Sequence, residues 1–500
     1  MDKKKSLLNI SVSIIFNIIS MIMVIVVKRF LIQICGNDVN GLNALYQSII
    51  GILSIAELGV GIAISFCMYK PIVDKDEDKV SALYHLFKKL HLIIGGFIFT
   101  AGLGVAPFIK YLAKDYQVLD VNFYLTFFLV LVSTVITYFF GAKIGLINSY
   151  KNNYITSMIT YGGLIVQYVL QIICLVLTRS FLLYLACRIV GSLLQWLITS
   201  IVTKRKYYHI TKNRQKVDKE TKETLTRSIK AMFMHKLGRT FTSSIDSVII
   251  SSFVGVIALG EYSNYIVILT SMTNVIKLIF TSIISVIGHL YAESNKETSR
   301  KSCEMLHYVN FFVGMIFYLG YYAIIDNLIA LLFLEELIIL RTTTLVITLN
   351  GFIQFMRESV IAYRDATGTF YYDRWKSVLE GAVKIVLSII LVKVIGVVGV
   401  ILATIITDIF ISHTIEPYVL YINAFNYSPK KHYIRNYLFI VIFFVALLLL
   451  DFLMVNATTH IVSLLMNGVI SVAISGAICL IALLANKPLA VKLIGFVKRK

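Results

Sequence analysis

Residues 10–27 read ISVSIIFNIISMIMVIVV, a run of 18 residues without a charge that follows the lysine cluster Lys3–Lys5. A helix needs about 20 mostly apolar residues to cross the hydrocarbon core of a bilayer, which is roughly 30 Å thick. The run is longer than the usual apolar core of a secretory signal, and no small-x-small cleavage site follows it. We therefore expect a retained first membrane span, with the N-terminus in the cytoplasm.

The composition of the whole chain extends this pattern. Of the 500 residues, 58% are apolar and 15% are charged, whereas a soluble domain is about half apolar and about a quarter charged. Mean hydropathy is +0.81, and long apolar runs alternate with short basic stretches. These features exclude a soluble enzyme, a disordered chain and a secreted disulfide scaffold. They predict an all-α integral membrane protein.

Run lengths predict about 14 transmembrane helices rather than a barrel, whose strands would alternate over only about ten residues. The expected spans are 10–34, 42–68, 90–112, 122–147, 155–177, 181–203, 231–254, 262–288, 304–333, 342–362, 377–395, 397–422, 434–455 and 460–485. An even number places both termini in the cytoplasm.

The net charge of +20 is distributed as a membrane topology requires. Most of the 47 lysines and arginines lie in segments that this topology places in the cytoplasm, as the positive-inside rule expects. Because the basic residues sit in the gaps between apolar runs, we expect no nucleic-acid partner. A miscounted span would invert every later loop and destroy the segregation.

The two halves of the chain show an internal repeat. A shift of 219 positions places two glycines and a tyrosine of the first half on the same residue types in the second: Gly36, Gly41 and Tyr46 on Gly255, Gly260 and Tyr265. Coincidence among apolar helices remains the alternative. Repeats with six spans each insert in the same sense, and such paired bundles hold a substrate site near the midplane, where they meet.

This repeat predicts the domain organisation, with two pseudo-symmetric six-helix lobes around a central cavity. The expected parts are an N-terminal lobe at 1–203, a basic cytoplasmic linker at 204–230, a C-terminal lobe at 231–425, two appended helices at 434–485 and a basic cytoplasmic tail at 486–500.

Several spans carry polar residues at helical spacing, and these define the candidate site. An ionisable side chain that faces lipid costs several kcal/mol, so it should face protein or a watery cavity. The cations expected to line the cavity and bind substrate are Lys28, Arg188, Arg239 and Lys277. The residues expected to pair with those cations or to carry a coupling ion are Glu57, Asp246, Glu380 and Lys384.

A surplus of buried cations would predict an anionic substrate, because arginine offers phosphate a bidentate fork and lysine a point charge. The alternative is that these residues satisfy one another between helices, as a pairing of Arg239 with Asp246 would do. Asp408 is a further carboxylate within a span that could neutralise a cation.

Catalytic and metal-binding signatures are absent from the sequence. It contains no G-x-x-x-x-G-K-[ST], no H-E-x-x-H and no G-x-S-x-G. Its six cysteines and nine histidines are scattered without metal-ligand spacing. We therefore expect a transporter rather than an enzyme, with no catalytic residues, no metal and no cofactor other than a coupling proton or sodium ion.

Four segments resemble a known family. The first two are Lys28–Ile32 with Gly36 and Gly41–Tyr46, and Leu53–Gly61 with Tyr69–Pro71. The others are His235–Gly238 with Ser244–Asp246 and Gly260–Tyr265, and Arg364–Gly368 with Asp373–Arg374, Glu380, Gly396–Val400 and Glu416–Pro417. Together they are similar to the Wzx-type polysaccharide repeat-unit flippases of the multidrug/oligosaccharidyl-lipid/polysaccharide (MOP) exporter superfamily.

The resemblance implies a MATE-like fold that works by alternating access. The implied cargo is an undecaprenyl-diphosphate-linked oligosaccharide, moved across the bacterial plasma membrane for capsule or exopolysaccharide assembly. Membrane lipids, a polysaccharide polymerase and glycosyltransferases would be its partners. Two alternatives stay open: an ion-coupled exporter of cationic drugs with the same fold, and a membrane glycosyltransferase or polymerase that processes the same lipid.

Overall fold

The structure is a computed structural model in which every regular element is helical throughout the described residues. It describes residues 3–57, 60–115, 117, 119–213, 215, 217–218, 221–223, 225–226, 229, 244–369 and 372–485. The chain divides into two compact units, unit 1 at Met1–Gly260 and unit 2 at Glu261–Lys500. Each unit is described by itself.

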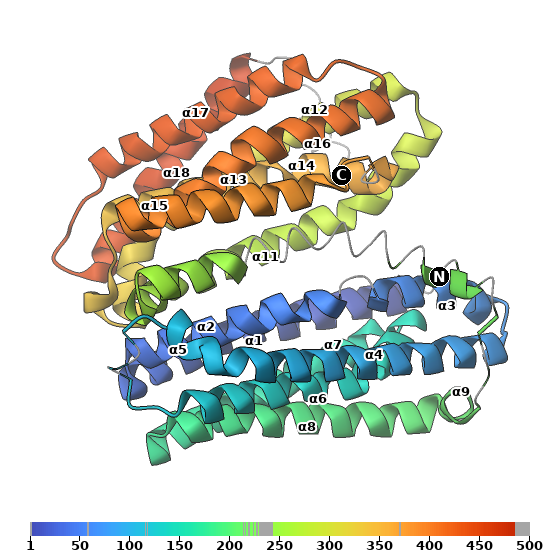
Figure 1. Ribbon diagram of the computed structural model, residues 1–500. Coiled ribbons are helices and arrows are strands. Elements are labelled where there is room, and N and C mark those ends of the chain that lie inside the picture. Colours follow the sequence, from blue (N-terminus) through green and yellow to red (C-terminus); the bar gives the residue numbers. More distant parts are fainter. Residues whose placement is uncertain are drawn as a thin grey trace. The chain divides into compact units, whose positions relative to one another are not determined.

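Unit 1 is a bundle of long helices. Its main elements are α1 (Lys3–Cys35), α2 (Asn37–Leu53), the 3₁₀ turn η1 (Ser54–Glu57), α3 (Val60–Val73), α4 (Glu77–Val105), α6 (Phe123–Ser149), α7 (Asn153–Thr178), α8 (Phe181–Lys206), α9 (Tyr208–Lys212) and a helix at Ser244–Phe253. Figure 1 shows these long helices running alongside one another. Helix α7 packs against α1 and α8, while α6 packs against α4 and α8.

Unit 2 is built around α12, which contacts α13, α17 and α18. Its elements are α11 (Val256–Glu293, which starts in unit 1), α12 (Lys296–Leu332), α13 (Arg341–Met356), α14 (Glu358–Thr367), α15 (Lys376–Thr407), the π-helix η6 (Asp408–Ser412), α16 (His413–Leu420), the π-helix η7 (Tyr421–Phe425), α17 (Lys430–Leu453) and α18 (His460–Ala485). Stacked phenylalanine rings join α12, α13 and α17. The ring centroids of Phe311 and Phe439 are 4.0 Å apart, and those of Phe352 and Phe443 are 3.7 Å apart.

The helices agree with the expected all-α membrane fold. Within the described residues, ten helices are long and apolar enough to cross a membrane. The expected span at 42–68 is divided among α2, η1 and α3, and much of the expected span at 231–254 lies outside the described residues. The predicted number of 14 is compatible with these helices.

The expected boundary between the spans 377–395 and 397–422 appears as a kink in α15. Ile395 and Gly396 leave helical geometry, and Gly396 has a φ of 59°, which an L side chain rarely adopts. The glycine therefore allows one continuous helical stretch to change direction where the sequence predicts two spans.

Two glycines related by the internal repeat have the same role in the backbone. Gly36 precedes α2 with a φ of 94°, and Gly255 precedes α11 with a φ of 142°. Just inside these helices, Gly41 and Gly260 let the backbones of α2 and α11 approach closely. A Cβ placed on Gly41 would overlap the carbonyl of Val256.

We expect Gly41→Ala to destabilise unit 1 by about 1 to 3 kcal/mol, the usual effect of forcing extra atoms into a packed contact. The backbone of Val256 cannot rotate away as a flexible side chain would. The matched control is Gly96→Ala in α4, where an added Cβ meets nothing within 4 Å. Thermal unfolding of both purified variants checks this, and an equal midpoint for Gly41→Ala and Gly96→Ala would contradict it.

Candidate functional site

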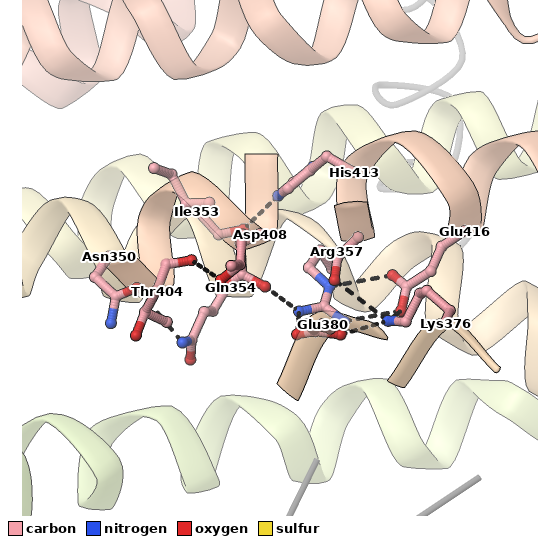
Figure 2. A network of polar contacts seen from close by, with 12 residues as sticks. Asn350, Ile353, Gln354, Arg357, Lys376, Glu380, Thr404, Asp408, His413 and Glu416 are labelled. Atoms are coloured by element: carbon pink, nitrogen blue, oxygen red, sulfur yellow. Dashed lines mark hydrogen bonds and ion pairs between the residues drawn. The ribbon is translucent and has the colours of Figure 1, made fainter. Parts of the chain in front are cut away.

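A group of buried charged side chains links the helices of unit 2 around Arg357 (Figure 2). Arg357 lies at the break between α13 and α14. Its Nη1 donates to Asp408 Oδ1 at 2.6 Å. Its Nε and Nη2 donate to the two carboxylate oxygens of Glu416, at 3.1 and 2.8 Å. This is the bidentate geometry that a guanidinium makes with a carboxylate, so one arginine ties α13 to η6 and α16.

Two further cations converge on Glu416. Lys376 Nζ lies 2.6 Å from Glu416 Oε1 and 3.0 Å from Glu380 Oε2. Arg364 Nη1 lies 2.6 Å from Asp373 Oδ2 and 3.3 Å from Glu416 Oε1. Burial raises the pKa of Asp373, which lies in the loop before α15, and the adjacent Arg364 partly offsets that rise.

The contacts of these side chains define a set that we call the buried charge network. Its members are Arg357, Arg364, Lys376, Asp373, Glu380, Asp408 and Glu416. Lys384 lies near enough to Asp408 to act on it electrostatically, and with it four cations face four carboxylates. The network is therefore close to electroneutral, which suits a structural tie better than an anion site.

Two of the predicted site residues, Glu380 and Lys384, lie in or beside this network. Sequence reasoning had not singled out Arg357 and Lys376. A usable signal was present, because Arg357 and Arg364 are seven positions apart in a helical region and Lys376 and Glu380 are four apart, spacings that place side chains on one helix face.

Arg188 has a different environment in unit 1. It lies on α8, and its Nη2 donates to the amide oxygen of Gln47 at 3.1 Å. Within the described part of the chain, no carboxylate forms an ion pair with it, and the charged or titratable neighbours that act on it are Tyr184 and Tyr168. Arg188 is half-buried, and the neutral amide of Gln47 does not balance its positive charge.

The other predicted cations have distinct positions. Lys28 lies on α1 and is half-buried. Lys277 on α11 pairs with Glu358 at the start of α14, with 2.9 Å between Nζ and Oε1. Arg239 lies outside the described residues. Asp246 is buried in the helix Ser244–Phe253.

The small polar residues of α1 contact α7. Ser13 shares a hydrogen bond with Ser157, and the amide of Asn17 donates to the hydroxyl of Tyr161, at 2.7 and 3.2 Å. Because both pairs are offset by 144 positions, one face of α1 runs along one face of α7. Ser13 and Asn17 thus join α1 to α7 through polar contacts between helices.

Glu57 lies at the end of η1 and faces a histidine. Its Oε1 is 3.6 Å from Nε2 of His91, which lies on α4 and is buried. Both side chains line a cavity of about 580 Å³ within unit 1. Across the described residues, no group of three or more His, Cys, Asp or Glu side chains is arranged to hold a metal ion.

No protein-family model matches the sequence, and no curated protein matches it. Among solved structures, the lipid II flippase MurJ in an inward closed conformation has a TM-score of 0.65 and 13% identity, over 94% of this chain and 99% of that one. An inward-facing multidrug resistance MATE family transporter of the MOP superfamily has a TM-score of 0.60 and 14% identity, over 87% and 98%. A MATE structure in a bent conformation has a TM-score of 0.52 and 14% identity, over 87% of this chain and 97% of that one.

At these identities the comparisons establish the fold. The chain has the all-helical membrane fold of MATE transporters and of MurJ, and the predicted fold class is confirmed.

Proposed function

We propose that this chain is a flippase that moves an undecaprenyl-diphosphate-linked oligosaccharide repeat unit across the bacterial plasma membrane by alternating access. The cargo would serve capsule or exopolysaccharide assembly. Two findings support the proposal: the fold is similar to a lipid II flippase over nearly the whole chain, and four segments resemble the Wzx-type flippases.

The observation that carries the proposal is the environment of Arg188. An unpaired charge in a membrane is costly, so an intramembrane arginine without a carboxylate partner is a functional-site candidate. A diphosphate headgroup has the complementary need, because it loses its water on crossing and needs donors with positive charge in exchange. Arg188 would supply these donors directly, since its partner in the described chain, Gln47, is neutral.

The remaining predicted residues have supporting roles in this proposal. Lys28 and Arg239 would add positive charge along the path of the headgroup, and Lys277 would do so to the extent that the headgroup replaces its partner Glu358. Glu57 and Asp246 would hold those cations or carry a coupling proton or sodium ion. Glu380 would act as a cation partner within the buried charge network, and Lys384 would add positive charge beside it. A polymerase and glycosyltransferases of the same membrane would be partners, and both termini would lie in the cytoplasm.

The rival function is export of cationic small molecules, which the fold similarity to multidrug MATE transporters keeps open. A single experiment separates the two. The full chain is reconstituted in vesicles and offered either a fluorescent undecaprenyl-diphosphate-linked oligosaccharide or the cationic dye ethidium. We expect it to accelerate translocation of the lipid-linked sugar over protein-free vesicles. Transport of ethidium alone by correctly folded protein would refute the proposal and favour the rival.

A further inference from the structure

The cavity within unit 1, which we call the unit 1 cavity, has the features of a built binding site. It is lined by residues of η1, α3, α4, α6, α7 and α8 and has a volume of about 580 Å³. Small-molecule sites typically enclose about 300 to 1,000 Å³. Of the described residues that line it, Glu57 is the one for which the sequence predicts a role.

Three side chains of the unit 1 cavity present polar atoms with no partner in the described chain. Gln195 on α8 is only 7% exposed, yet its amide has no protein hydrogen bond. His91 is 3% exposed, and its Nδ1 is buried without a partner. Thr160 on α7 is half-buried, lines the cavity and has no hydrogen bond within the described residues. A buried donor or acceptor left unsatisfied is unfavourable, so such a group is expected to meet water or a ligand.

Two glycines leave room for the helix backbones to pack directly against two of these side chains. A Cβ on Gly163 of α7 would overlap the side chain of Gln195, and a Cβ on Gly141 of α6 would overlap the ring of His91. The ring of His91 also lies edge-to-face with that of Phe87, with 4.5 Å between centroids. The polar groups are therefore fixed before a ligand arrives, which lowers the entropic cost of binding.

The lining restricts the chemistry of the ligand. It combines amides and hydroxyls with aromatic rings, including those of Tyr69 and Tyr138, and it contains one carboxylate, Glu57. Among the described residues that line it there is no lysine or arginine, so they offer a phosphate group no counter-charge. A purely apolar ligand would leave the amides unpaired. A neutral polyhydroxylated ligand satisfies donors and acceptors and offers its C–H faces to the rings.

We propose that the unit 1 cavity binds a neutral sugar, and that Gln195, Thr160 and His91 recognise its hydroxyl groups. The inference rests on the proposed function, since the sugar would be part of the lipid-linked oligosaccharide. It assigns sugar recognition to unit 1 residues that are distinct from the cations proposed to bind the diphosphate.

Saturation-transfer NMR on the full chain in nanodiscs tests this with glucose, galactose, rhamnose and N-acetylglucosamine as probes, and tetraethylammonium as a cationic probe. We expect the wild-type protein to bind at least one of the neutral sugars. Gln195→Leu and Thr160→Val should each weaken that binding about fivefold or more, the factor for one lost neutral hydrogen bond. Thr178→Val, at an exposed position of the same helix α7, should bind like wild type.

Three outcomes would overturn the proposal: no saturation transfer to any of the four sugars, sugar binding unchanged in both cavity variants, or binding of tetraethylammonium in their place. Thr160→Val keeps the test valid if Gln195→Leu fails to fold. The translocation assay separates this proposal from the proposed function, because a chain that moves the lipid-linked cargo but binds no sugar in this cavity refutes the cavity proposal alone.

Discussion

Arg357→Met is expected to lower the free energy of unfolding by about 3 to 5 kcal/mol, the usual result of removing one partner of a buried ion pair. The substitution removes the closest cation of Asp408 and the bidentate partner of Glu416, and both carboxylates are at most 2% exposed. Methionine matches the aliphatic part of the arginine, so lost packing contributes little. The effect should exceed that of any other single change proposed for this chain.

The matched control comes from an exposed ion pair of unit 2. Lys301 and Glu297 lie 2.6 Å apart with more than half of each side chain exposed, and such pairs contribute about 0 to 1 kcal/mol. SDS-induced unfolding of wild type, Arg357→Met and Lys301→Met gives the three free energies. Equal losses in the two variants would contradict a structural role for the buried charge network.

Arg188→Gln is expected to slow translocation of the lipid-linked oligosaccharide by roughly 10- to 100-fold, the factor for a lost hydrogen bond to a charged group. Glutamine keeps a donor near Gln47 but removes the positive charge. Arg188→Lys should retain part of the rate, because it keeps the charge and loses the bidentate fork. The measurement is the initial rate in reconstituted vesicles with equal amounts of folded protein.

The control for this prediction is Arg179→Gln. Arg179 is exposed at the C-terminal end of α7, so the variant loses the same charge from the same unit outside the proposed path. A wild-type rate in Arg188→Gln would refute the proposed role of Arg188. An equal decrease in both variants would assign the effect to overall charge.

The fold was predictable because its main determinant is local in sequence. Apolar runs of helical length must form internally hydrogen-bonded helices in a bilayer, and the expected spans coincide with α1, α6, α7, α8, α12, α17 and α18. The position of the kink at Gly396 could also be predicted, because the glycine lies at the expected boundary between two spans. The breaks at η6 and η7 carry no comparable signal in the sequence.

The candidate site was harder to predict from the sequence, because the residues that contact one another there are distant in the chain. Hydropathy and spacing identified Arg188 and Lys277 as intramembrane cations. Only the structure shows that their partners differ in charge: Arg188 contacts the neutral amide of Gln47, whereas Lys277 contacts the carboxylate of Glu358. Helical spacing reveals which residues share a face, whereas the residues on the facing helix depend on packing.

The same limit applies to the unit 1 cavity. Gln195 lies in the same expected span, 181–203, as Arg188, but nothing in the sequence indicates that Gly163 and Gly141 make room for two unpartnered side chains. The cavity arises where helices that are separated by loops converge.

The central claim is that cations within the membrane recognise the diphosphate of a lipid-linked sugar. The most direct test compares, in the same vesicles, one oligosaccharide carried on undecaprenyl diphosphate with the same oligosaccharide carried on an uncharged polyprenol. We predict that wild-type protein moves the diphosphate-linked cargo much faster and that Arg188→Gln removes most of this preference. Equal rates for the two cargoes with wild-type protein would contradict the claim.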